Sequence, residues 1–303
     1  MSASLLEIIR NDDLDSLICF MRDKSDFNLI IDGNNTNCTI LKSNPPVLSV
    51  SCFYSALKCF QYLQGNDWNT NLRDLKGRHL IHFTAACDSL IIFDQLEALG
   101  IDLRHLDYKG NGIIHYCSKY NGESVLRRCL LNGLDIAKPN QKGELPIHIA
   151  CKKGYKSIVE LLCNYESPID LLDAKQRLPI QIALEGGHGS IVRILLAKKS
   201  PTDFLIANLP PIVWAARCGK RQIVEILLEF IKDRIDDPDA LGWTPLHFAA
   251  EQGYTDICEI LVQNGASINK ETINGMTSLH LAQNRQRLDT SEFLQKNGAL
   301  TWV

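Results

Sequence analysis

The heptapeptide Thr-Pro-Leu-His-Phe-Ala-Ala at residues 244–250 returns along this chain of 303 residues at a nearly constant interval. Residues 145–150 (LPIHIA) and 277–282 (TSLHLA) are close copies, and four weaker ones accompany them. Taken at the histidine position, the copies stand at 82, 115, 148, 181, 213, 247 and 280, so the steps are 32 to 34 residues. A fixed period of this length predicts an array of small stacked units and not one globular core.

The clearest unit runs from residue 240 to residue 269. Gly242 permits a tight turn, Thr244 is a good N-cap, and Pro245 suits the first position of a short helix. A second helix with apolar residues at helical spacing follows and ends before Gly265. The sequence pattern of each unit therefore predicts a turn followed by two short helices.

This unit resembles the ankyrin repeat, which has a β-turn, two antiparallel helices and a Thr-Pro-Leu-His phrase. The resemblance implies an all-α fold, a solenoid of stacked helix-turn-helix units with β-turn hairpins. It covers nearly the whole chain: a partial unit at residues 5–21, a weak one at 46–64 and seven more, about nine in total. We expect a divergent N-terminal capping repeat with an inserted loop at residues 1–44 and one continuous array at residues 45–303. Residues 22–44 hold the insertion, interpreted as a surface loop or a mobile segment.

Three positions depart from the repeat pattern. Gln176 stands where the turn glycine is expected, which predicts a distorted hairpin tip. Val213 replaces the recurring histidine. Arg128 falls where the second helix usually buries a leucine, so either that helix is shifted or the arginine extends its charged end to solvent.

Composition favours an intracellular protein. The hydrophobic share of 45% is ordinary, no apolar run is long enough to span a membrane, and no secretory signal is visible at the start. The 11 cysteines are scattered without a Cys-x-x-Cys pair and are expected to be small buried residues in a reducing compartment. Those at helix positions are Cys117, Cys129, Cys151, Cys163, Cys218 and Cys258. The expected location is the cytoplasm, with the nucleus as the alternative, and the sequons at Asn34 and Asn37 would then be silent.

Catalytic signatures are missing from the sequence. It has no phosphate-binding Gly-x-x-x-x-Gly-Lys loop, no Gly-x-Ser-x-Gly elbow and no His-Glu-x-x-His helix, and residues 186–189 (GGHG) fit an inter-helix turn. The recurring histidines lie one unit apart, too far to share a metal ion, and the resemblance implies that they link adjacent turns. The acidic residues 233–239 lack the glycine and glutamate of a calcium loop and are interpreted as a solvated linker. We expect no enzyme activity, no metal and no cofactor.

Charge is unevenly distributed along the chain. The net charge is −4 over residues 1–100, +7 over 101–221 and −6 over 222–303. The resemblance implies that partners bind in a concave groove lined by the turns and the first helices. Projected onto that groove, the candidate partner-binding residues are Arg78, Lys109, Lys142, Lys175, Arg177 and Trp243 at turns, and Lys119, Tyr120, Lys152, Lys153 and Arg217 at helix ends.

This mostly basic set favours an acidic segment of a protein partner, with Tyr120 and Trp243 as aromatic anchors. The alternatives are a merely solvated charged face and a Trp243 that packs on the next hairpin.

The predicted function is a non-enzymatic protein–protein interaction module: an adaptor, scaffold or inhibitor. The alternative is a specificity or regulatory subunit of a larger enzyme complex, such as a substrate receptor. Nucleic-acid binding is disfavoured because the chain is acidic overall and carries no basic run. No membrane insertion is expected, and the chain is expected to be a monomer. The final residues Thr301-Trp302-Val303 either form a tail of the kind that PDZ-type domains capture or let Trp302 cover the last repeat.

Overall fold

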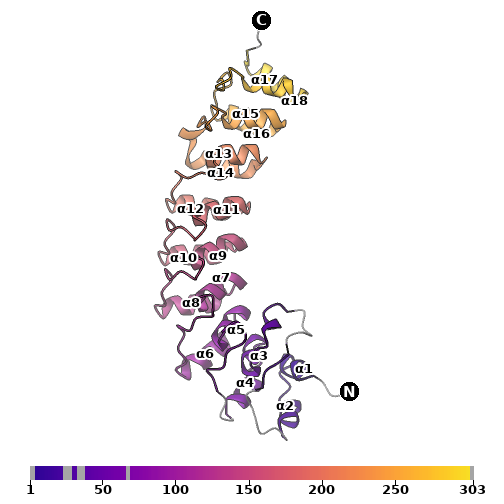
Figure 1. Cartoon of the computed structure of the whole chain (residues 1–303), viewed down its shortest axis with the longest axis vertical. Coiled ribbons are helices and arrows are strands. Elements are labelled where there is room, and N and C mark those ends of the chain that lie inside the picture. The colour runs from indigo at the N-terminus through magenta and orange to yellow at the C-terminus, as the bar shows by residue number, and fades with distance from the viewer. Residues whose placement is uncertain (1–3, 23–28, 33–37, 66–68, 301–303) are drawn as a thin grey trace. The chain divides into compact units, whose positions relative to one another are not determined.

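A computed structural model describes residues 4–22, 29–32, 38–65 and 69–300 (Figure 1). These residues contain eighteen α-helices and, apart from isolated β-bridges, no strand, which confirms the all-α prediction. The chain divides into two compact units, an N-terminal unit of residues 1–179 and a C-terminal unit of residues 180–303. The two units meet at residues 179 and 180, whereas the sequence predicted a domain boundary after residue 44. The boundary after residue 44 stays a prediction. The tail residues 301–303 and both sequon asparagines lie outside the described residues.

The helices follow one another in pairs, and the first two pairs lie where the weak N-terminal repeats are predicted. The N-terminal unit contains α1 (Leu5–Arg10), α2 (Leu14–Met21), η2 (Leu41–Ser43), α3 (Val47–Phe53), α4 (Leu57–Gln64), α5 (Leu80–Cys87), α6 (Leu90–Ala98), α7 (Ile113–Tyr120), α8 (Glu123–Leu131), α9 (Pro146–Lys153) and α10 (Lys156–Asn164). The C-terminal unit contains α11 (Pro179–Glu185, whose first residue ends the other unit), α12 (Gly189–Ala197), α13 (Pro211–Arg217), α14 (Arg221–Phe230), η3 (Lys232–Arg234), α15 (Pro245–Gln252), α16 (Thr255–Gln263), α17 (Ser278–Asn284) and α18 (Leu288–Lys296).

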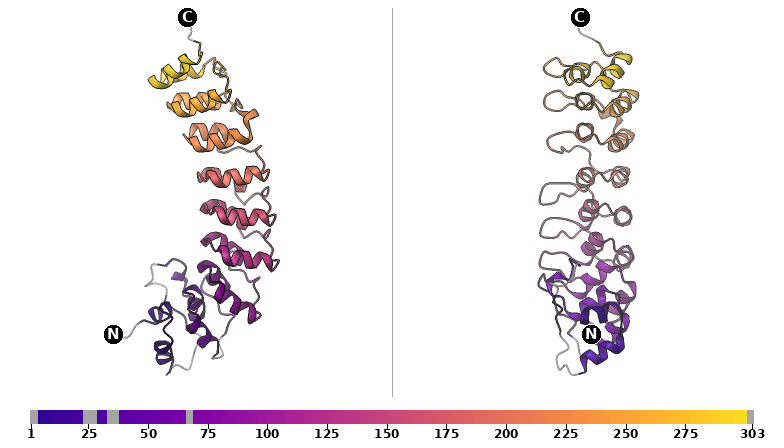
Figure 2. Two further views of the ribbon diagram at one scale, coloured as in Figure 1. Left: turned by 180° about the vertical axis from the view of Figure 1, so that it is seen from behind. Right: turned by 90° about the vertical axis from the view of Figure 1, so that its right-hand side faces the viewer.

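Within each unit the helices form two layers (Figure 2). In the N-terminal unit α3, α5, α7 and α9 pack in succession, and α6, α8 and α10 do the same beside them. In the C-terminal unit α13, α15 and α17 form one row, and α12, α14, α16 and α18 form the other. Within the described ranges, no helix is longer than α14, which has 10 residues. Helices this short are marginal in isolation, so stacking between neighbours supplies the stability.

The turns are built around a side-chain acceptor that recurs every 33 residues, at Asp74, Asp107, Asn140 and Asp173. One carboxylate or amide oxygen of each accepts hydrogen bonds, 2.8–3.0 Å long, from the backbone N–H groups two and four residues later. Successive turns are also joined, because the amide of Tyr108 donates to the Lys76 carbonyl at 3.0 Å and the amide of Ala174 to the Lys142 carbonyl at 2.8 Å. The turn tips therefore form a regular column. This acceptor was not among the residues that the sequence pattern predicted to be structurally important.

The recurring histidine links adjacent repeats, which confirms the structural role that the resemblance implied. The Nε2 atoms of His82, His115 and His148 lie 3.1–3.2 Å from carbonyl oxygens of the following repeat, and Nδ1 of each accepts from the N-cap amide of its own helix. A carbonyl oxygen only accepts, so Nε2 carries the proton and each imidazole is neutral. The Gln181 side-chain amide makes the same link, donating to the Leu205 carbonyl at 3.0 Å. Among the described residues no three His, Cys, Asp or Glu side chains are grouped to hold a metal ion.

Several sequence-based expectations need correction. Gln176 does not distort its hairpin: it adopts a left-handed φ of 58°, as the glycines do at this position, and its amide keeps the hydrogen bond to the Asp173 carbonyl at 2.9 Å. The inserted segment is not simply a surface loop, because Ile40 and Leu41 are buried. Cys218 is exposed just after α13, whereas the other five cysteines named above are buried.

The other two departures from the repeat are accommodated differently. Arg128 keeps its charged end in solvent, and its guanidinium pairs with Glu97 at 2.6 Å and Asp94 at 3.2 Å on α6. Val213 is buried on α13. The acidic stretch before the TPLHFAA phrase is more than a linker, because Asp239 accepts from the Leu241 and Trp243 amides.

Replacing Gln176 with glycine should stabilise the protein. A side chain in the left-handed region costs free energy, and glycine removes that cost while adding some entropy to the unfolded chain, so we expect a gain of about 0.5–1 kcal/mol in the free energy of unfolding. Urea denaturation followed by circular dichroism measures it. As the reverse control, Gly143→Ala should destabilise, because the added Cβ would lie 2.8 Å from the Ala174 amide nitrogen at a φ of 66°. An unchanged or lowered midpoint for Gln176→Gly would contradict this reading of the turn.

The histidine links should make stability depend on pH. Burial lowers the pKa of His82 from 6.5 to about 4. Above pH 6.5 the imidazole is neutral in both states, whereas between pH 6.5 and 4 only the unfolded chain gains a proton, so stability decreases as the pH is lowered through that window. We expect His82→Gln, which introduces the residue type found at Gln181, to reduce the stability lost between pH 7 and pH 5 by about 2 kcal/mol. Urea titrations at the two pH values test this, and identical losses in both proteins would refute it.

Candidate functional site

Four lysines occupy equivalent places on the column of turns in the N-terminal unit. Lys76, Lys109, Lys142 and Lys175 each stand directly before the residue with positive φ, and all four are exposed. Lys76 was not among the candidates from the sequence, although its spacing of 33 residues from Lys109 was available to identify it. The C-terminal unit has Leu241 and Asn274 at the corresponding places, so this lysine column belongs to the N-terminal unit alone.

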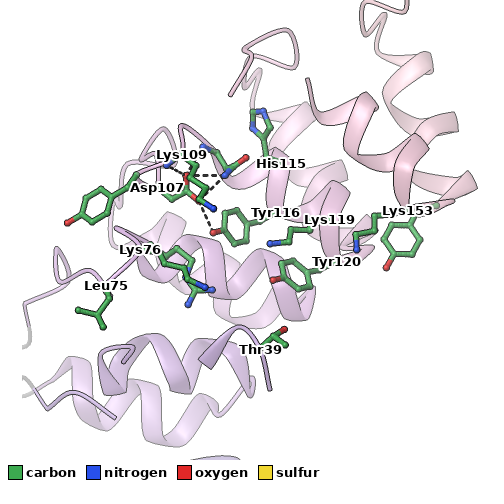
Figure 3. A pocket seen from close by; sticks show the side chains of 14 residues that line it. Thr39, Leu75, Lys76, Asp107, Lys109, His115, Tyr116, Lys119, Tyr120 and Lys153 are labelled. Carbon is green, nitrogen blue, oxygen red and sulfur yellow. Dashed lines mark hydrogen bonds between the residues drawn. The ribbon is translucent and has the colours of Figure 1, made fainter. Parts of the chain in front are cut away.

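A pocket of about 530 Å³ opens beside two of these turn lysines (Figure 3). Turn residues and the α7 and α9 helices provide most of its wall. Its basic side chains are Lys76, Arg78, Lys109, Lys119 and Lys153, and its aromatic ones include Tyr108, Tyr116, Tyr120 and Tyr155. The structure thus brings together five of the predicted residues, Arg78, Lys109, Lys119, Tyr120 and Lys153. The four lysines and the tyrosines make the pocket basic and aromatic at once.

The carboxylate in this pocket, Asp107, is occupied by internal hydrogen bonds. It accepts from the Tyr116 hydroxyl at 2.9 Å, from the Asn111 side-chain amide and from the backbone amides of its own turn. Burial alone would raise the pKa of Asp107, but the hydrogen bonds from Asn111 and from the Lys109 amide bring it below its usual value, so the group is ionised. Burial and the charge of Asp107 raise the pKa of Tyr116, which therefore stays a hydrogen-bond donor. Tyr116 and Asp107 shape the pocket floor.

Arg78 does not act as the free surface cation that its turn position predicted. Its side chain is only 3% exposed, its Nε donates to Asp74 Oδ2 at 2.6 Å, and a second nitrogen donates to the Ile40 carbonyl. The guanidinium also lies over the Phe83 ring, 4.8 Å from its centroid. The Arg78 guanidinium is thus buried and paired inside the fold, where it connects the described part of the insertion, at Ile40, with Phe83 of α5.

Lys119 lies at the centre of the aromatic part of the pocket. Its amine is 5.0 Å from the Tyr120 ring centroid and 5.6 Å from that of Tyr116, and the two rings stack 6.0 Å apart. Partial burial lowers the pKa of Lys119, and the positive charges of Arg78 and Lys153 lower it further. Lys76 has a lowered pKa for the same reasons, burial first and Arg78 second. These lysines stand in a field of positive potential.

The four pocket lysines have no ion-pair partner among the described residues, a property that they share with other exposed lysines such as Lys198 and Lys220. Within the part of the chain that the structure describes, no carboxylate lies within 4.0 Å of the amines of Lys76, Lys109, Lys119 or Lys153. Other exposed cations do form ion pairs with carboxylates, namely Arg128, Lys156, Arg193, Arg221, Arg285 and Lys296. Donors without acceptors are what a binding site for an anionic group requires.

The other predicted residues are spread more widely. Lys142, Lys152 and Lys175 are exposed on the N-terminal unit outside the pocket, and Arg177 pairs with Asp173 at 2.8 Å. Arg217 and Trp243 belong to the C-terminal unit, where the Arg217 guanidinium lies 5.6 Å from the Phe248 ring centroid. Trp243 packs on Phe248 and His247 of its own repeat, at centroid distances of 4.9 and 6.3 Å. Trp243 therefore has a packing role, but its ring contacts are to its own repeat and not to the next hairpin that the sequence-based alternative named.

Comparison with known proteins identifies the family. The family model described as ankyrin repeats (3 copies) matches residues 114–208 and 212–302, more than half of the chain. The chain therefore belongs to the ankyrin-repeat family, whose members generally have a non-catalytic, protein-interaction fold. None of the helices in the described residues has the length and apolar character needed to cross a membrane.

Similar curated proteins match only a short stretch. RelA-associated inhibitor from Mus musculus is 41% identical over 59 residues, and alpha-latrotoxin-Lh1a from Latrodectus hasselti is 39% identical over 61 residues. Each match covers 20% of this chain and 7% or 4% of the relative, so the chain spans less than a tenth of these proteins. Among solved structures, the human ASB11 ankyrin repeat domain has a TM-score of 0.59 at 23% identity, covering 74% of this chain and all of that one. The ankyrin repeat domain of Bcl-3 has a TM-score of 0.59 at 17% identity, covering 70% and 97%. These structures support the fold.

Tyr116→Phe should show how much the hydrogen bond from the Tyr116 hydroxyl to Asp107 contributes to the stability of the protein. The change leaves a buried, ionised Asp107 without one of its donors, which should lower the free energy of unfolding by about 1–2 kcal/mol. Tyr155→Phe is the matched control, because the Tyr155 hydroxyl has no hydrogen-bond partner among the described residues. Urea denaturation of the three proteins compares them, and equal stability of all three would show that the Tyr116–Asp107 bond contributes nothing.

Proposed function

We propose that this chain is an adaptor, scaffold or inhibitor that binds an acidic segment of a protein partner along the basic face of its N-terminal unit. The basic face consists of Lys76, Lys109, Lys119, Lys142, Lys152, Lys153 and Lys175. The observation that carries the proposal is the column of turn lysines, spaced by one repeat and lacking carboxylate partners within the described part of the chain. Family membership supports a protein as the partner.

The charge pattern favours an extended acidic ligand. Successive turns are tied by backbone hydrogen bonds, so their lysines are presented at a fixed repeat spacing on a stiff support. A complementary row of Asp and Glu side chains would engage several lysines together, and such complementarity speeds association and selects partners. The RelA-associated inhibitor bears a name that describes binding and inhibition, which agrees with this class of function. The proposed location is the cytoplasm or the nucleus.

The basic face can be tested by charge reversal and affinity capture. We expect Lys109→Glu/Lys142→Glu/Lys152→Glu/Lys175→Glu to lose the partners that the original chain captures from a cell lysate, because repulsion replaces attraction. Capture by the original chain should also weaken as salt rises, since screening shortens the range of these charges. Quantitative mass spectrometry of the captured proteins gives the readout, and circular dichroism confirms that the variant is folded.

The matched control places the same charge change in the C-terminal unit. Lys198→Glu/Lys199→Glu/Lys220→Glu/Lys232→Glu alters four exposed lysines outside the basic face and should keep the partners. Retention of the same partners by both variants would refute the basic face as the binding site. Subunits of an enzyme complex that remain bound to both variants would favour the alternative, a substrate receptor or regulatory subunit.

A further inference from the structure

The pocket beside the first two turn lysines has properties that the rest of the basic face lacks. Lys142, Lys152 and Lys175 stand on open surface, whereas Lys76, Lys109, Lys119 and Lys153 surround one hollow of about 530 Å³. That volume lies within the range of about 300–1,000 Å³ for pockets that enclose a small ligand or a side chain. The pocket is therefore a separate binding element within the face.

The charge of the pocket exceeds what one acidic side chain neutralises. Arg78 and Asp74 cancel one another, and Asp107 is the carboxylate that faces the four lysines within the lining. A Glu or Asp side chain from a partner would leave a surplus of positive charge. A phosphate monoester brings a charge of about −1.5 to −2 and three acceptor oxygens, and so suits a hollow that several lysines line.

The aromatic lining selects the group that carries the phosphate. Tyr108 is 65% exposed and the partly exposed Tyr120 ring lies beside Lys119, so the wall presents aromatic rings next to the amines, whereas the Tyr116 ring is buried and stacks on Tyr120 (Figure 3). An aromatic ring packs against such rings in stacked or edge-on geometry, which a serine or threonine side chain is too small to do. Room for a ring and donors for a phosphate occur together.

We propose that the pocket lined by Lys76, Lys109, Lys119 and Lys153 binds a phosphorylated side chain of the partner protein, with phosphotyrosine as the best fit. This inference rests on the proposed function, because the phosphorylated residue would belong to the acidic segment that follows the basic face. Phosphorylation of the partner would then control its binding to this chain.

The test uses the full chain and peptide pools with degenerate flanking residues around a fixed central residue. The central residues are phosphotyrosine, tyrosine, phosphoserine and glutamate, and fluorescence anisotropy measures binding. We expect the phosphotyrosine pool to bind at least about tenfold more tightly than the tyrosine pool, since the phosphate adds charge and acceptors. Phenyl phosphate should displace it at lower concentration than inorganic phosphate, because the ring contributes. Equal binding of the phosphotyrosine and tyrosine pools would overturn the proposal.

Two variants of equal charge separate the pocket from the general field of the face. Lys76→Gln/Lys119→Gln/Lys153→Gln should abolish the preference for phosphotyrosine, whereas Lys142→Gln/Lys152→Gln/Lys175→Gln should weaken all anionic pools and retain that preference. If both triples lower binding equally and phosphorylation has no effect, the basic face stands and the pocket inference fails. If neither triple changes binding of the glutamate pool, the proposed function fails as well. Binding to phosphatidylcholine vesicles doped with a phosphoinositide, without binding to any peptide pool, would also overturn the inference in favour of a membrane ligand.

Discussion

The hydrogen bond from a histidine Nε2 to a carbonyl of the following repeat is the interaction on which the array depends. His82, His115, His148 and His247 each make it, and Gln181 reproduces it with an amide. The bond needs a neutral imidazole, because Nδ1 must accept from the N-cap amide while Nε2 donates. Burial keeps the imidazoles neutral by lowering their pKa, so the link and the packing support one another.

The turns between the helix pairs form the surface that carries the lysines. Each acidic or amide side chain at the start of a turn satisfies two backbone amides, which fixes the turn shape and leaves the next residue but one, a lysine, pointing outward. In the N-terminal unit the acceptor and the lysine recur together every 33 residues, whereas the Asp239 turn of the C-terminal unit carries Leu241 at the lysine's place. The same covalent period that stacks the helices thus places like charges in a row. Such a row is electrostatically unfavourable unless a partner of opposite charge or solvent compensates it.

Most of the fold was predictable from the sequence because its signals are local. The TPLHFAA phrase, the turn glycines and the apolar spacing predicted helix pairs even at residues 5–21 and 46–64, and the structure has helices in both ranges. Two of the errors came from side chains that meet elements distant in sequence. The packing of Ile40 and Leu41 and the burial of Arg78, which donates to the Ile40 carbonyl, depend on neighbours that a local pattern does not name.

The sequence by itself determined the repeat, the all-α class and the basic middle third of the chain, because these follow from spacing and composition. Only the tertiary structure decided which cations are available to a partner. Arg78 and Lys76 are two residues apart on one turn, yet Arg78 is buried against Asp74 and Lys76 borders the pocket. Tyr116, Tyr155 and Asp107 entered the site for the same reason: which side chains border one hollow depends on how neighbouring repeats stack. Stacking is set by contacts between residues about 33 positions apart, and a local sequence pattern carries no information on those contacts.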